Sequence, residues 1–249
     1  MARLRSGLLP INIAERVDSS HMQFDSPNAE WMTKVRRPLA RKFFDRDPRV
    51  VSRELLGKVL VRREGRRLLA GRVVEVEAYL GTDDAAAHSA AGRTARNAVL
   101  FGPPGYVYVY FIYGNHYCLN VSCLPDGVAG GILFRAVEPL VGIPTMAERR
   151  VIMVETLRDL LKLTSGPGRL AEAFGITRDR DNKKDFTNPR SDLWLADDGF
   201  AAPKIVVTKR IGITKSADRP LRYLIRGNAF VSGPRISHGL RGSLRILKS

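Results

Sequence analysis

The segment from Gly71 to His88 narrows the possible folds of this chain more than any other. Over residues 73–80 the side chains alternate between two faces, as they do in a β-strand. One face is apolar and the other carries two carboxylates and a phenol: Val74, Val76, Ala78 and Leu80 alternate with Val73, Glu75, Glu77 and Tyr79. Glutamate is disfavoured in strands. Two of them on one face therefore indicate either a functional site or ion pairs with basic residues of a neighbouring strand.

The composition favours an anionic partner. The chain has 249 residues, 44% of them hydrophobic, which is enough for one large or two small domains with a core. Its 41 lysines and arginines against 25 acidic residues give a net charge of +16, typical of a protein that binds phosphates. Against a membrane partner, we find no bilayer-spanning apolar run, long basic amphipathic helix or signal-peptide pattern. We therefore expect an intracellular nucleic-acid-binding protein, in a bacterial cytoplasm and nucleoid or in a nucleus.

The cysteines and histidines indicate chemistry without a metal. Cys118 and Cys123 are too few for a disulfide framework, a structural zinc site or a four-cysteine iron–sulfur cluster. The four histidines are scattered and show no metal-ligand spacing. The sequence therefore predicts no metal and no cofactor, and a reducing compartment.

The secondary-structure pattern predicts a single compact α+β (mixed α/β) domain, with a curved, mostly antiparallel sheet, flanking helices and a protruding β-hairpin. Strands are expected near residues 58–63, 68–80, 106–113, 117–122, 131–137, 192–195, 204–208 and 221–226. Helices are expected near residues 43–56, 151–161 and 165–174, and a charged loop over 179–190. The first hairpin places Tyr113 at or near its tip.

The two ends of the chain differ from the part between them. Residues 1–36 show no sustained periodicity and are expected to form a flexible basic leader. The globular, catalytic domain is expected over residues 37–235. Residues 236–249 are expected to form a basic tail that contacts a polyanion, because no acidic residue occurs from Gly227 onward.

Tyrosines are concentrated in the part of the chain expected to form the sheet. Six of the seven lie there: Tyr79, Tyr106, Tyr108, Tyr110, Tyr113 and Tyr117. Tyrosine rings stack on bases, with about 1–3 kcal/mol per base in single-stranded sites, although a tyrosine-rich strand is more often simply half-buried. Beside Glu77, His88 and the positive charge, a base-binding cleft is the better explanation.

A carboxylate in such a cleft could act as a general base and activate water for attack on a sugar C1′. A nucleobase deaminase would need zinc ligands and a Pro-Cys-x-x-Cys pattern, which the sequence lacks. No lysine stands out near this face, so hydrolysis is favoured over a Schiff-base mechanism. Two alternatives stay open: Glu75, on the same face, could be the base, and His88 could simply cap a turn.

A series of motifs follows in order along roughly residues 40–232. They are Glu77-Ala-Tyr-Leu-Gly81 with His88, Pro104-Gly105, Tyr108-Val-Tyr-x-x-Tyr-Gly114, Asn120, Arg135-Ala-x-Glu-Pro139, Ser165-Gly-Pro-x-Arg-Leu170, Arg210-Ile-Gly212, Pro220-Leu-Arg-Tyr and Arg226-Gly227. Together they resemble the alkyladenine (3-methyladenine, or methylpurine) DNA glycosylases. The resemblance implies a monomeric base-excision-repair enzyme. Such an enzyme flips alkylated or deaminated purines out of double-stranded DNA and hydrolyses the N-glycosidic bond, leaving an abasic site.

The resemblance also implies roles for single residues. Glu77 would be the general base, with Arg135 and the backbone carbonyl of Ile211 helping to hold the attacking water. The pocket for the flipped base would be formed by Tyr79, His88, Tyr110 and Asn120, and Tyr113 would intercalate in the duplex. Asn120 would reject the 2-amino group of normal guanine. Candidates for phosphate contacts are Arg93, Arg96, Gly166, Gly168, Arg169, Arg210 and Gly212.

Two other functions compete with this one. A non-catalytic nucleic-acid-binding module of related fold would stack or flip bases with Glu77 in a structural role. A basic ribosome-associated or RNA-binding protein would account for the charge, but it leaves the grouping of Glu77, Tyr79 and His88 without a purpose.

Overall fold

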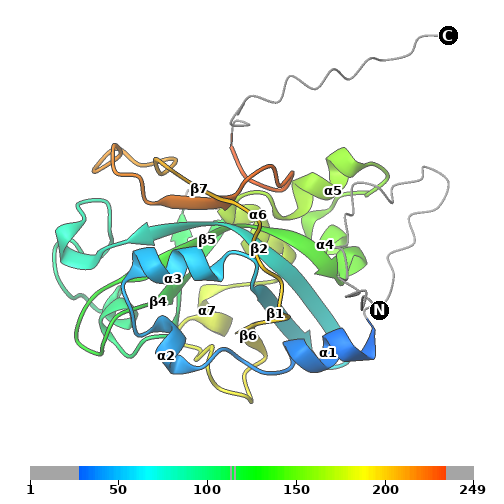
Figure 1. Cartoon of the computed structure of the whole chain (residues 1–249), viewed down its shortest axis with the longest axis horizontal. Coiled ribbons are helices and arrows are strands. Elements are labelled where there is room, and N and C mark those ends of the chain that lie inside the picture. The colour runs from blue at the N-terminus through cyan, green and yellow to red at the C-terminus, as the bar shows by residue number, and fades with distance from the viewer. Residues whose placement is uncertain (1–27, 113, 115, 234–249) are drawn as a thin grey trace, which may run out of the picture.

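The computed structural model describes residues 28–112, 114 and 116–233, and its centre is an eight-stranded sheet (Figure 1). Six strands follow the order β3-β4-β5-β2-β1-β6, β8 also pairs with β2, and β7 pairs with β8, with every pairing antiparallel. The strands are β1 (Val59–Glu64), β2 (Arg67–Tyr79), β3 (Val107–Ile112), β4 (His116–Ser122), β5 (Gly131–Val141), β6 (Leu193–Ala196), β7 (Ile205–Thr208) and β8 (Arg222–Ile225). The predicted α+β fold with an antiparallel sheet is confirmed.

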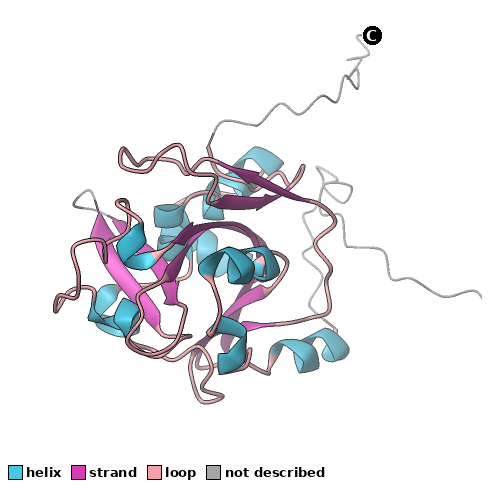
Figure 2. Ribbon diagram, turned by 60° about the vertical axis from the view of Figure 1, so that its left-hand side comes forward, coloured by secondary structure: helices cyan, strands magenta, loops and turns pink. Residues whose placement is uncertain are grey.

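Strand β2 organises the sheet because it is long and changes partner along its length. It has 13 residues. Its first half pairs with β1 and its second half, over Glu75–Glu77, pairs with β8, while β5 runs along its other side. The register with β5 shifts around Glu75, and such bulges bend a strand and re-aim its side chains. Figure 2 shows the resulting curvature of the sheet. Both glutamates consequently lie in the interior of the sheet, where three strands meet.

Seven α-helices flank the sheet within the described residues. They are α1 (Ala29–Val35), α2 (Arg41–Phe44), α3 (Pro48–Leu55), α4 (Ile143–Arg150), α5 (Leu157–Thr164), α6 (Pro167–Ala173) and α7 (Arg178–Asp181). Helix α3 packs on β2, whereas α6 packs on β4 and β5. Figure 1 shows α4, α5 and α6 as one group, separate from α2 and α3. None of the helices in this described part is both long and apolar enough to cross a membrane.

The helix expected over residues 151–161 is wrong in its bounds. Helix α4 ends at Arg150, and Val151 caps it in a left-handed conformation, with φ 49°, donating its N–H to carbonyls of the last turn. Thr156 then caps α5 by accepting from the Asp159 N–H. Ile152 and Val154, between the two helices, still pack against the core. Val151 and Met153 in the same loop are exposed, so the loop side chains alternate between solvent and the core, and its apolar run imitates the periodicity of a helix.

Helix α1 lies inside the segment expected to be a flexible leader, so that expectation is corrected for residues 29–35. Asn28 caps the helix by accepting from the Trp31 N–H. The Trp31 indole donates to Asp198 at 2.9 Å, and Val35 is buried. This helix is thus docked on the domain by contacts with residues far along the chain. Residues 1–27 and the expected tail, 236–249, lie outside the described residues.

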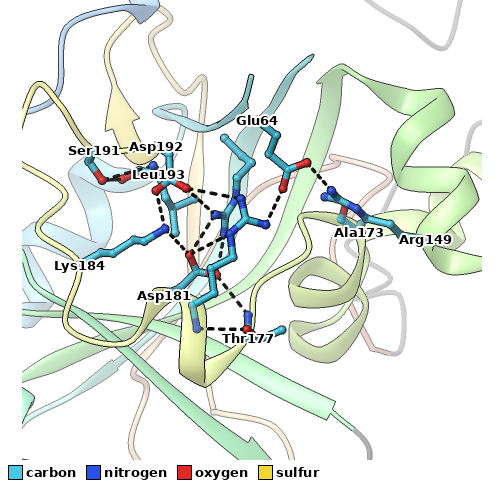
Figure 3. A network of polar contacts seen from close by, with 11 residues as sticks. Glu64, Arg149, Ala173, Thr177, Asp181, Lys184, Ser191, Asp192 and Leu193 are labelled. Carbon is cyan, nitrogen blue, oxygen red and sulfur yellow. Dashed lines mark hydrogen bonds and ion pairs between the residues drawn. The ribbon is translucent and has the colours of Figure 1, made fainter. Parts of the chain in front are cut away.

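The segment expected to be a charged loop contains α7 and a buried ion network. The Arg62 guanidinium of β1 donates to both carboxylate oxygens of Asp181, at 2.9 and 2.7 Å, and both side chains are fully buried. Lys184 pairs with the same carboxylate at 2.8 Å. Figure 3 shows the network extending to Asp192 and to Glu64. Because a buried charge without its partner is costly, these contacts fix α7 against the sheet.

Candidate active site

Glu77 is fully buried in β2, with both carboxylate oxygens held by neighbours. Its Oε1 accepts from the backbone N–H of Ile211 at 2.9 Å and lies 3.1 Å from Nη1 of Arg135. Its Oε2 accepts from the hydroxyl of Tyr79 at 3.0 Å. Burial raises the pKa of the Glu77 carboxyl above its usual value, although these three partners act in the opposite direction. A buried carboxyl with a raised pKa and fixed partners suits the role of a general base.

Glu75, the alternative base, is equally buried but has different hydrogen-bond partners. Its Oε1 accepts from Nε of Arg135 at 2.8 Å, from Nε of Arg222 at 2.6 Å and from the hydroxyl of Ser232 at 3.0 Å. Its Oε2 accepts from the Ser232 N–H at 2.5 Å. A carboxylate bound by two guanidinium groups and a serine has little capacity left for a water molecule. Glu77 has one guanidinium partner where Glu75 has two, and its role as the base stays a prediction.

An aromatic cavity of about 350 Å³ lies beside Glu77. Tyr79, Arg135 and Ile211, the three partners of Glu77, all line it. So do the four residues expected to form the base pocket: Tyr79, His88, Tyr110 and Asn120. The volume is in the range of small-molecule sites, and the flat aromatic walls suit a planar ligand such as a purine. The carboxylate itself lies behind the wall rather than in it.

His88 is held in this wall by two tyrosines. Its Nδ1 lies 2.9 Å from the Tyr108 hydroxyl, and its ring packs edge-to-face on Tyr110 with centroids 4.4 Å apart. Burial, together with the nearby charge of Arg96, lowers the pKa of His88. The imidazole is therefore neutral at neutral pH, and its Nδ1 is engaged by Tyr108. A histidine that only capped a turn would not need these contacts with Tyr108 and Tyr110.

Residues 42–229 match the family model for methylpurine-DNA glycosylase. The chain belongs to the methylpurine-DNA glycosylase family. A relative from Koribacter versatilis is 70% identical over 198 residues, which cover 80% of this chain and 94% of the relative. One from Burkholderia lata is 44% identical over 86% of this chain and 98% of its own length, and one from Methanoculleus marisnigri is 45% identical over 78% and 98%. All three are provisionally named 3-methyladenine DNA glycosylase. The predicted family and enzyme class, a DNA-repair glycosylase acting on DNA, are thereby confirmed.

Arg210 of this glycosylase, expected to contact a phosphate, is instead a structural residue. Its guanidinium donates to both oxygens of Asp84, at 2.5 and 2.8 Å, and both side chains are fully buried. It also donates to the carbonyl of Ala78 and lies over the Tyr79 ring, 4.6 Å from the centroid. The pair thus supports one wall of the cavity from behind, and we withdraw the phosphate role.

The other phosphate candidates of the glycosylase are three arginines and three glycines. Arg93, Arg96 and Arg169 are exposed and stay candidates. Gly168 has a packing role, because a Cβ there would lie 2.9 Å from Cγ of His116 on β4. The remaining two have positive φ, 122° at Gly166 and 75° at Gly212, which L residues rarely adopt. Tyr113, the expected intercalating residue, lies outside the described residues.

Three residues of the site were not predicted from the sequence. Asp84 follows the Glu77 motif directly, and Arg222 lies within the Pro220-Leu-Arg-Tyr motif, so both carried a local signal. Ser232 carried none, because an isolated serine near the end of a domain is common. The backbone N–H of Ile211 contacts Glu77, and the expected role of its carbonyl in holding the attacking water stays a prediction.

Proposed function

We propose that this chain is a monomeric, monofunctional glycosylase that flips a damaged purine out of duplex DNA and hydrolyses its N-glycosidic bond with water activated by Glu77. One observation carries the proposal. Glu77 is buried and held by Tyr79, Ile211 and Arg135, and all three of these line the same aromatic cavity. Release of the free purine from methylated duplex DNA tests it.

In the proposed reaction a water molecule attacks C1′ of the flipped nucleotide. The electron pair of the N-glycosidic bond leaves with the purine, and Glu77 takes the proton from the water. The transition state resembles an oxocarbenium ion, which a buried carboxylate stabilises strongly because the site excludes bulk water. Purines alkylated at a ring nitrogen are cationic and leave readily. The faces of Tyr79 and Tyr110 favour such a cation.

Duplex binding in this proposal rests on the hairpin and on exposed arginines. Flipping a nucleotide costs a few kcal/mol, and less at a damaged pair. Tyr113, which follows Val107–Ile112 in the sequence, would fill the vacated space as an unstacking wedge. Arg93, Arg96 and Arg169 would neutralise phosphates near the cavity. The net charge of +16 favours such a polyanionic partner.

Base release should depend on pH through the Glu77 carboxyl. Glu77 accepts a proton only when it is ionised, and burial raises its pKa above the usual 4.5. The rate of base release should therefore rise with pH through an apparent pKa above 4.5 and then reach a plateau. Single-turnover rates between pH 4.5 and 9 on a cationic 3-alkylated adenine measure this. A rate already at its plateau at pH 4.5 would show that Glu77 is not the group that titrates.

Asn120 should influence which damaged purine is released. Asn120 is buried in the cavity wall, and its amide donates to the Tyr108 carbonyl at 3.2 Å. Asn120→Ala should enlarge the cavity and raise release of 7-methylguanine relative to 3-methyladenine by about tenfold, the scale of steric selection in a pocket. Asn228→Ala, which removes an asparagine bonded to Glu138, is the control. An unchanged ratio in Asn120→Ala would remove this residue from specificity.

A further inference from the structure

Ser232 lies beyond residue 229, where the match to the family model ends. It nevertheless contacts Glu75, which together with Arg135 and Arg222 forms a buried cluster of charged side chains. It is buried, with 5% exposure. Its hydroxyl donates to Oε1 of Glu75 at 3.0 Å and accepts from Nη2 of Arg135 at 3.2 Å. Its N–H donates to Glu75, and its carbonyl accepts from Nη2 of Arg222 at 2.7 Å. One serine thus meets Glu75 and both arginines that bind it.

Arg135 links this cluster to the proposed base. Its Nε donates to Glu75, its Nη2 to Ser232, and its Nη1 faces Oε1 of Glu77 at 3.1 Å. A guanidinium group is planar and rigid. Because Glu75 and Ser232 engage two of its nitrogens, the third is directed at Glu77.

The segment around Ser232 also contacts Ile211, whose backbone N–H binds Glu77. The Ser165 hydroxyl donates to the carbonyl of Phe230 at 2.7 Å, which ties the segment to the start of α6. At Gly233, whose φ is 81°, a Cβ would lie 2.8 Å from Cδ1 of Ile211, so the backbone there approaches the Ile211 side chain closely. The N–H of Ile211 in turn binds Glu77. Residues 230–233 therefore contact both Arg135 and Ile211.

Taking the proposed role of Glu77 as given, we propose that Ser232 is a positioning residue that acts through Glu75 and Arg135 to hold a guanidinium against the catalytic carboxylate. Removing its hydroxyl has two effects of the same sign. Arg135 is less firmly oriented, and the negative charge of Glu75 loses a hydrogen-bond donor. Both make the ionised form of Glu77 less favourable.

The direction of this effect depends on every charged or titratable group that faces Glu77. These groups are Glu75, Tyr79, Cys118, Arg135, Arg210 and Arg222. The Ser232 hydroxyl contacts two of them, Glu75 and Arg135, whereas the contact with Arg222 is made by the backbone carbonyl and is kept in Ser232→Ala. Loss of the hydroxyl should consequently loosen Arg135 and move the protonation of Glu77 to higher pH.

The test compares Ser232→Ala with a matched control. Ser122 is also buried, and its hydroxyl also makes two hydrogen bonds, to the Pro103 carbonyl at 2.8 Å and from the Tyr106 N–H at 2.9 Å, but neither reaches a carboxylate. For Ser232→Ala the acid limb of the single-turnover rate should move up by about half a pH unit or more. That shift corresponds to about a threefold loss of rate below the limb, with the high-pH plateau nearly unchanged. Ser122→Ala should leave the limb in place.

Two results would overturn the proposal: an unmoved limb in Ser232→Ala, or an equal shift in Ser122→Ala. A serine that merely supports folding would lower the melting temperature without moving the limb. If Ser232→Ala does not fold, Ser232→Cys, with its weak thiol donor, should give a smaller shift of the same direction, and no shift there would also count against the role. Failure of the proposed function is distinguishable, because the parent chain itself would then release no base at any pH.

Discussion

Glu77→Gln should lower the single-turnover rate of base release by about 10²–10⁴-fold, the contribution of a positioned general base. Glutamine keeps the size of the side chain, and its carbonyl can still accept from the Ile211 N–H, but it cannot take a proton from water. Binding of damaged duplex DNA should be retained, because Glu77 is fully buried. Parallel measurements of release and of binding therefore separate an enzyme from a binding module in which Glu77 is structural.

Stability gives an independent check on the same variant. The folded-state pKa of Glu77 is raised by burial. Its carboxyl therefore contributes stability that is fully present below the unfolded pKa, near 4.5, and is lost as pH rises through the folded pKa. The amide removes this dependence, so the stability of Glu77→Gln relative to the parent should increase with pH in urea unfolding.

Glu138→Gln is the matched control for these experiments. Glu138 lies on β5, accepts from the Asn228 amide at 3.0 Å and does not line the cavity. Release should stay within about twofold of the parent, since no catalytic contact is lost. Full activity in Glu77→Gln would contradict the assignment of the base, and a loss in both variants would indicate a general effect of removing a sheet carboxylate.

Asp84→Ala should lower the free energy of unfolding by about 3–5 kcal/mol, because it leaves the Arg210 guanidinium buried without a counter-ion. Both side chains are fully buried and joined by two hydrogen bonds. Because Arg210 also lies over Tyr79, the cavity wall should loosen, and base release should fall as well. Urea unfolding of the two proteins measures the first effect.

An exposed pair of the same geometry supplies the control. Arg46 donates through both Nη atoms to Glu54, at 2.9 and 2.8 Å, on the surface of α3. Glu54→Ala should cost at most about 1 kcal/mol, because solvent screens the exposed pair. Arg210→Met separates the two roles of that arginine. If it contacted a phosphate, the slope of log affinity against log salt would fall by about one, whereas the structural role leaves the slope unchanged.

The alternation in β2 predicts the strand and the shared face of its two glutamates, but it cannot decide between them. The contacts that do so join residues 134 positions apart for Ile211 and Glu77, and 157 positions apart for Ser232 and Glu75. Such pairings depend on tertiary structure. For the same reason the pattern could not show that Arg210 faces Asp84, 126 residues away, rather than solvent.

The missed bounds of α4 have a more local cause. Gly142 and Pro144 begin that helix, and proline in the first turn is a recognised start signal. The apolar run after Arg150 nevertheless led to a predicted helix that begins at residue 151. Periodicity reports only which residues are buried, and Ile152 is partly buried in a loop. Element boundaries there depend on capping contacts, such as the one Thr156 makes.

The most direct test of the central claim is base release by the parent chain in excess over duplex DNA carrying 3-methyladenine. The free purine is measured together with the integrity of the strand. Hydrolysis by water activated at Glu77 predicts first-order appearance of 3-methyladenine, with an abasic strand that breaks only on treatment with alkali. No release of the purine, or a protein–DNA adduct trapped by borohydride with strand cleavage, would contradict it.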